Sequence, residues 1–269
     1  MSSRWEEFYA SLAIPTDFEE NKNKIKDFCE HVSSQQKIVL VTSGGTTVPL
    51  EHNTVRFVDN FSAGTRGSAS AEYFLEKGYV VIFVHRLKSL EPYVRHFMGQ
   101  KFLDMLEIHN DEAETSVVAA CECLAPFGAR AVLYLAAAVS DFYIPSSQMP
   151  THKMQSEAGA PNISLQLVPK ILEPLVNTWV PHAYVVSFKL ETDENLLITR
   201  ARGALSKYKH KMVIANILHT RKYRVVLVMA TTCSEIVLDP EEIEAGIEIE
   251  SKIVSELTKR HESFIAESV

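Results

Sequence analysis

The chain has 269 residues, of which 46% are hydrophobic and 23% charged, a composition typical of a globular protein and unlike that of a disordered chain. Its 27 Lys and Arg face 34 Asp and Glu, and the net charge of −7 argues against a dedicated nucleic-acid-binding protein. The sequence has no apolar run of ~18 residues, no signal-peptide pattern and too few cysteines for a disulfide scaffold. We therefore expect a soluble, cytoplasmic protein that binds neither nucleic acid nor membrane.

The predicted elements alternate along the chain. Helical spacing opens it over 3–12 and 17–33, within an N-terminal helical segment of residues 1–36. Short, mostly apolar runs predict strands at 37–42, 79–84, 102–108, 131–136, 183–188, 212–215 and 223–228. Helices are expected at 64–77, 111–125, 193–208 and from 240 onward.

Two helix ends carry clear local signals. Gly78 is placed to end the helix over 64–77, because glycine readily adopts the left-handed conformation found there. Asp239 and Glu242 form a capping-box pattern around Pro240 at the start of the last helix. The apolar face expected for that helix comprises Ile243, Ile247, Val254, Leu257 and Ile265.

This alternation predicts an α/β fold: a Rossmann-like, doubly wound, mostly parallel sheet with helices on both faces. Because no repeat, low-complexity tract or linker interrupts it, a single domain over 1–269 is favoured, with a protruding loop or lid element over 142–170. In such sheets ligands bind beyond the carboxyl ends of the strands. The search for a site therefore begins at those ends.

Common nucleotide and metal motifs are missing from the sequence. It contains no Walker A loop and no GxGxxG, and the second predicted strand ends in His85 and Arg86 where a nicotinamide-binding protein would place an acid. The histidines show no metal-ligand spacing, so the metal ligands cannot be named. A nicotinamide-dependent oxidoreductase remains an alternative that these observations disfavour.

Two segments before or at the start of the helix expected at 64–77 combine glycines with polar residues. In Thr42–Thr47, the adjacent Gly44 and Gly45 suit either an anion-binding turn or a plain tight turn. The segment 55–67 enters a helix, whose first N–H groups suit a phosphate. There Ser62 is expected to cap the helix and Gly67 to permit close approach of a ligand, while a capped surface helix is the alternative.

A third segment, 135–143, places three alanines and Asp141 at a strand end. The alanines leave room for a ligand beside exposed backbone, although a contact between small residues and a helix is the alternative. The following proline-containing loop carries Lys153, which could close over a phosphate as a lid.

Together these segments resemble the signatures of the phosphopantothenoylcysteine synthetase family, in its stand-alone eukaryotic form. The resemblance extends over about 37–265 and includes a fourth motif, Ser187–Thr192. It implies a ligase of coenzyme A biosynthesis that joins 4′-phosphopantothenate to L-cysteine by an amide bond. ATP and Mg²⁺ would activate the carboxylate as an acyl-adenylate with release of pyrophosphate, and attack by the cysteine amine would release AMP.

The resemblance also implies roles for individual residues. Asn60 and Lys153 would be catalytic, Asn60 by binding the substrate and donating to the acyl oxygen, and Lys153 by acting on the triphosphate or transition state. Arg56 would reach the substrate from the neighbouring subunit of a homodimer formed through the protruding element. The other substrate-binding positions would be Ala137, Ala138 and Asp141. The nucleotide-binding positions would be Gly44, Ser62, Gly64, Gly67, Phe188 and Asn216.

The nucleotide itself follows from the eukaryotic branch, which prefers ATP, with CTP as the alternative. Bacterial members that use CTP carry lysines where Ala204 and Tyr208 stand here. A non-catalytic, regulatory relative is the other alternative, which the presence of Asn60, Asp141 and Lys153 disfavours.

Overall fold

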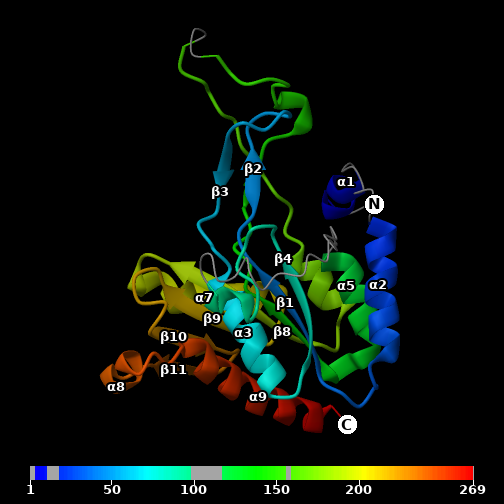
Figure 1. Ribbon diagram of the computed structural model, residues 1–269, viewed down its shortest axis with the longest axis vertical. Coiled ribbons are helices and arrows are strands. Elements are labelled where there is room, and N and C mark those ends of the chain that lie inside the picture. The colour runs from blue at the N-terminus through cyan, green and yellow to red at the C-terminus, as the bar shows by residue number, and fades with distance from the viewer. Residues whose placement is uncertain (1–3, 11–17, 98–116, 156–158, 269) are drawn as a thin grey trace.

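The computed structural model describes residues 4–10, 18–97, 117–155 and 159–268. At its centre lies a seven-stranded sheet in the order β11-β10-β9-β8-β5-β1-β4 (Figure 1). Five strands pair in parallel: β1 (Ile38–Ser43), β4 (Val80–His85), β5 (Ala131–Leu135), β8 (Tyr184–Glu191) and β9 (Met212–Ile217). Two antiparallel strands complete one edge: β10 (Arg224–Val228) and β11 (Cys233–Val237). The predicted α/β fold with a mostly parallel sheet is confirmed.

Helices cover both faces of this sheet, because its strands are apolar on both sides. α3 (Thr65–Glu76) and α9 (Ile249–Glu267) pack on one face, where Phe74 and Leu257 are fully buried. The other face carries α2 (Phe18–His31), α5 (Val117–Leu124) and α7 (Glu194–Tyr208). The shorter helical elements are α1 (Arg4–Ala10), η1 (Val94–His96), η2 (Ala125–Arg130), η3 (Ser146–Gln148), α6 (Leu172–Pro174), η5 (Leu175–Trp179) and α8 (Pro240–Glu244).

The last predicted helix is in fact two helices. Asp239 and Glu242 form the expected capping box at the start of α8, but the chain turns at Gly246, whose φ is +73°, before α9 begins. Ile243 and Ile247 are 42% and 44% exposed, so their assignment to the apolar face was wrong. The residues of α9 that do pack into the core include Ile249, Ile253, Val254 and Leu257.

Other differences are local. Gly78 has a φ of +75° just after α3, as predicted. The strand expected at 102–108 and the start of the helix expected at 111–125 lie outside the described residues, and α5 corresponds to the rest of that helix. Strand β11 was not predicted, since its residues, Cys233–Val237, do not alternate between polar and apolar in the sequence.

Two chain segments project together from the sheet, and together we call them the arm (Figure 1). The first is 47–59, and the second comprises the described residues 142–155 and 159–170. It contains two short hairpins, formed by β2 (Thr47–Pro49) with β3 (Phe57–Asp59) and by β6 (Phe142–Tyr143) with β7 (Gln166–Leu167). Backbone hydrogen bonds join the segments, from His52 N to Pro150 O (2.9 Å) and from Asn53 N to Thr151 O (3.0 Å). The element at 142–170 thus shares the arm with residues that precede α3.

Candidate functional site

The site lies where the winding of the sheet reverses. From β1 the chain passes first to β4 on one side and then to β5 on the other, so the carboxyl ends of β1 and β5 flank a crevice of the kind in which α/β proteins bind ligands. There Thr46 N donates to Ala138 O (3.0 Å) and Ala138 N to Gly44 O (2.8 Å). These bonds bring the first and third motifs together.

Asn60 joins the second motif to the other two. Its backbone N–H donates to Thr46 O (3.1 Å), and its side-chain Nδ2 donates to Ala138 O (2.9 Å) and toward Thr46 Oγ1 (3.4 Å). Because a carbonyl oxygen can only accept, the amide nitrogen must face Ala138. Both amide hydrogens are thereby directed at the protein, and Oδ1 is the polar atom that Asn60 has left for a ligand. The expected donation from Asn60 to an acyl oxygen is not available in this geometry.

The amino end of α3 meets the glycine loop. Its N-cap is Gly64, with a φ of +84°, and no side chain caps the helix among the residues described. Ser62 Oγ accepts a long hydrogen bond from Gly64 N (3.4 Å), so the prediction that Ser62 itself caps the helix was wrong. The uncapped first-turn N–H groups and the positive end of the helix dipole suit an anion.

Gly67 has a packing reason to be glycine. A Cβ there would lie 2.4 Å from Ser43 Oγ and 3.1 Å from Ser43 Cα, so α3 approaches β1 too closely for any side chain. Gly67 was expected to permit the close approach of a ligand, but in the structure it is β1 that approaches it closely. Gly44, with a φ of +89°, likewise leaves no room for a side chain, because its Cβ would lie 2.4 Å from Ser89 Oγ.

Phe188 and Asn216 lie on the neighbouring strands β8 and β9. The ring of Phe188 contacts Tyr134 edge-on, with the ring centres 5.0 Å apart. Asn216 is 6% exposed, and its Oδ1 has no hydrogen-bond partner within the described part of the chain. A buried, unpaired acceptor near an aromatic ring fits a ligand that carries an N–H group, such as the amino group of a nucleobase.

Arg56 and Lys153 lie in the arm. Arg56 directly precedes β3, at the end of that strand away from the sheet (Figure 1). Arg56 donates from Nε to Glu51 Oε1 (2.9 Å) and from Nη2 to Met154 O (2.9 Å), next to the exposed Lys153. Enclosure raises the pKa of the buried Glu51, but the hydrogen bonds from Arg56 and Val55 outweigh it and hold that pKa below its usual range. Asn60 lies at the base of the arm, and within the described residues neither Arg56 nor Lys153 contacts it.

Asp141 lies at the base of the arm, where it forms an ion pair with Lys170. Its backbone carbonyl accepts from Val168 N (2.9 Å). Asp141 thus follows the half-buried Ala137 and Ala138 at the edge of the crevice.

A charged pair beside the glycine loop was not predicted as part of the site. Arg86, directly after β4, bonds Asp59 and also donates to Thr47 Oγ1 (2.8 Å), and Thr47 Oγ1 donates to Asp59 Oδ1 (3.0 Å). The hydrogen bond from Arg86 is the main reason that the pKa of Asp59 lies below its usual range. The signal in the sequence was the cation at the end of the second strand, which served only as an argument against nicotinamide binding.

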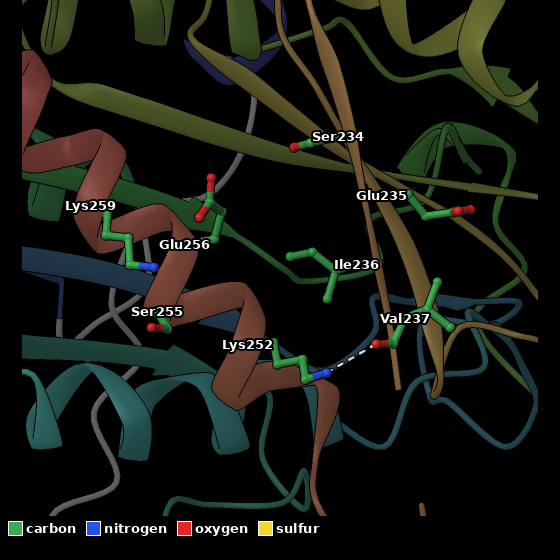
Figure 2. Close-up of a pocket in the computed structure, with 8 residues that line it drawn as sticks. All are labelled: Ser234, Glu235, Ile236, Val237, Lys252, Ser255, Glu256 and Lys259. Carbon is green, nitrogen blue, oxygen red and sulfur yellow. Dashed lines mark hydrogen bonds between the residues drawn. The ribbon is translucent and has the colours of Figure 1, made fainter. Parts of the chain in front are cut away.

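A cavity of about 480 Å³ lies elsewhere, between β11 and α9 (Figure 2). Lys252 spans its rim by donating to Val237 O (3.1 Å), and the other lining residues come from the same two elements. This cavity lies on the edge strand farthest from β4 and lacks the three motifs. Within the described ranges, no helix is long and apolar enough to cross a membrane, and no three acidic, His or Cys side chains are grouped to hold a metal ion.

Comparison with known proteins agrees with this fold and site. The family described as DNA/pantothenate metabolism flavoprotein, C-terminal domain, matches residues 34–252, so the chain belongs to that family. Curated phosphopantothenate–cysteine ligases from Homo sapiens and Mus musculus are each 43% identical over an alignment that covers 86% of this chain and 88% of theirs. The yeast ligase CAB2 is 37% identical, over 98% of this chain and 87% of its own. Within the family, the chain is thus a member of the phosphopantothenate–cysteine ligases.

Solved structures support the same relationship. A mutant of Cab2 in complex with phosphopantothenate-cysteine has a TM-score of 0.86 and 37% identity, over 98% of this chain and 99% of that one. A Streptococcus pneumoniae DNA/pantothenate metabolism flavoprotein, at 21% identity and a TM-score of 0.62, shares the fold over 85% of this chain and 99% of its own.

Proposed function

We propose that this protein joins 4′-phosphopantothenate to L-cysteine, using ATP and Mg²⁺ and passing through an acyl-adenylate that releases pyrophosphate and then AMP. The observation that carries the proposal is the junction of three motifs at the reversal of the sheet, where Asn60 binds both Thr46 and Ala138. A free carboxylate is a poor electrophile. Adenylation gives it a leaving group, AMP, which departs when the cysteine amine attacks the acyl carbon. The identity with curated ligases supports the same reaction.

The nucleotide would bind across the glycine loop. The N–H groups at the start of α3 and near Gly44 would hold the phosphates, while Phe188 and the unpaired Oδ1 of Asn216 would contact the base. Gly67 and Ser62 contribute to the same region. Since no acidic cluster is present among the described residues, Mg²⁺ would reach the site with the triphosphate, which is the usual way for nucleotide sites to hold it.

Phosphopantothenate would lie along the crevice beside Ala137 and Ala138, toward Asp141. Its carboxylate and the triphosphate repel each other, so the site must supply donors and cations. Arg86 and Lys170 already lie at its edges, each paired with an acid, despite the net negative charge of the chain.

The active form would be a cytoplasmic homodimer. Large hydrophobic residues are exposed on the arm and at its base, which is typical of an association surface. They are Val55, Phe57, Val58, Phe61, Val139, Phe142, Ile163, Leu165 and Leu167. Arg56 and Lys153 belong to the same projecting element, so association through the arm would carry them toward the neighbouring site.

The test is pyrophosphate release by the purified protein with Mg²⁺ and 4′-phosphopantothenate, with ATP or CTP, each with and without L-cysteine. We expect cysteine-dependent turnover with ATP and formation of AMP. Formation of ADP and phosphate would overturn the acyl-adenylate, and turnover with CTP alone would overturn the choice of nucleotide. No turnover with either nucleotide, from a folded dimer, would overturn the enzymatic assignment in favour of a regulatory relative.

A further inference from the structure

Thr46 is the residue at which the three motifs meet. It lies between β1 and β2, and its backbone bonds both Asn60 and Ala138. Its side-chain Oγ1 accepts from Ser140 N (2.6 Å) and, more weakly, from Asn60 Nδ2 (3.4 Å). Both bonds are acceptances, because a backbone N–H and an amide nitrogen can only donate.

The hydroxyl hydrogen of Thr46 is left over by this arrangement. A hydroxyl has one hydrogen to donate and two lone pairs, and here both lone pairs are engaged. Among the residues that the structure describes, none offers an acceptor to this hydrogen, and the residue is exposed to solvent. The neighbouring Thr47 differs, since it accepts from Arg86 and also donates to the Asp59 carboxylate.

We propose that the Thr46 hydroxyl donates a hydrogen bond to the carboxylate of the bound 4′-phosphopantothenate; this inference rests on the proposed function. Acceptance of two hydrogen bonds polarises the O–H group and makes it a stronger donor, which suits an anionic oxygen. Asn60 does not compete for that role, because its amide hydrogens are directed at Ala138 and Thr46.

The position of Thr46 favours the carboxylate over a phosphate as the acceptor. The phosphates have the N–H groups at the start of α3, whereas Thr46 presents a single donor beside the Oδ1 of Asn60, between the ends of β1 and β5. A single donor next to an acceptor matches the carboxylate end of 4′-phosphopantothenate, where one carboxylate is to be joined to an amine.

The experiment compares two ligands by calorimetry without nucleotide: 4′-phosphopantothenate and the analogue in which a methyl group replaces its carboxylate. Thr46→Val removes the hydroxyl while it keeps the size of the side chain. We expect it to weaken 4′-phosphopantothenate binding by about 10- to 100-fold, the effect of one hydrogen bond to a charged group, and to leave analogue binding unchanged. Thr46→Ser should bind both ligands within about twofold of the wild type, because it retains the donor.

Thr232→Val is the matched control, since it removes an exposed threonine hydroxyl in the turn between β10 and β11, away from the crevice, and it should preserve the preference for the carboxylate. If Thr46→Val weakens the binding of both ligands by the same factor, the hydroxyl only positions its neighbours, and the inference is overturned. It is also overturned if the binding of neither ligand changes. Thr46→Ala replaces the valine variant if thermal melting shows that the latter does not fold. Failure of the wild type to bind 4′-phosphopantothenate would instead overturn the proposed function.

Discussion

The side-chain amide of Asn60 donates to the carbonyl oxygen of Ala138 at 2.9 Å and so joins two motifs that are 78 residues apart in the chain. The same nitrogen faces Thr46 Oγ1, so the position of this side chain depends on its ability to donate. A change that removes the donor therefore tests the site without a change in side-chain size.

Asn60→Asp should slow amide formation by about 10²-fold, because the loss of both donations would displace this side chain from its place in the crevice. The carboxylate would face two oxygen atoms to which it cannot donate, and it would add a negative charge beside an anionic substrate. Quench-flow measurement of amide formation gives the rate. Asn23→Asp, on the exposed side of α2, adds the same charge far from the site and should behave as the wild type. Unchanged amide formation in Asn60→Asp would contradict the role of Asn60.

Mixing two inactive variants should restore activity if Arg56 serves the site of its partner. Arg56→Gln keeps a donor for the buried Glu51, and Asn60→Ala removes the amide of the other subunit's site. After subunit exchange, the mixture should reach roughly a quarter of wild-type activity, because half of the dimers are hybrids and each hybrid has one intact site of two. Exchange is verified by native mass spectrometry of differently tagged chains. No recovery after proven exchange would show that Arg56 does not act across the dimer.

Gly67→Ala should destabilise the fold by about 1–3 kcal/mol, because its Cβ would overlap Ser43 on the adjoining strand. Gly203, exposed on α7, has nothing within 4 Å of the corresponding position. Gly203→Ala should therefore stabilise the protein by about 0.5–1 kcal/mol. Urea denaturation measures both variants. Equal effects of the two changes would contradict the close packing of α3 on β1.

Stability should fall as the pH drops from about 6.5 toward 4, and His261 should account for part of the loss. This buried side chain donates from Nε2 to Ala129 O (2.8 Å), and its Nδ1 lies 2.7 Å from the Tyr79 hydroxyl, which donates to it when the ring is neutral. Burial lowers its pKa from 6.5 to about 4, so the unfolded chain binds the proton more readily than the folded one. The stabilisation is complete above the unfolded pKa and is lost as the pH falls through this window.

The slope for one such histidine is about 1.4 kcal/mol per pH unit within the window. His210, whose pKa burial also lowers to about 4, adds a similar slope. His261→Gln should therefore lower the pH dependence of the unfolding free energy by about 1.4 kcal/mol per pH unit within this window, as followed by urea denaturation at several pH values. A variant with the full wild-type slope would show that His261 is not the titrating group.

The sequence allowed the central sheet to be predicted because its strands are buried apolar runs, as in β1 and β5. The short hairpin of β2 and β3 was not predicted, since strands of three residues are too short to show an alternating pattern. The division between α8 and α9 was missed because Ile243 and Ile247 continue the helical spacing past the turn at Gly246.

The positions of the site motifs could be predicted from the ends of the strands, whereas the hydrogen bonds between the motifs could not. Which way the amide of Asn60 points depends on Ala138, a partner far along the chain, and no local spacing encodes it. The cap of α3 was assigned to Ser62 because serine is a common capping residue, but the left-handed Gly64 takes that position.

Residues 67–71 at the start of α3 are all small and buried. A larger side chain at any of them would have to displace its neighbours, and at Gly67 it would push the helix away from β1, and with it the N–H groups proposed to hold the phosphates. Substitutions that alter nucleotide choice would therefore have to arise around the base, near Phe188 and Asn216. In directed evolution of this protein, libraries built on that region should yield folded variants, whereas libraries at 67–71 should yield mostly insoluble ones.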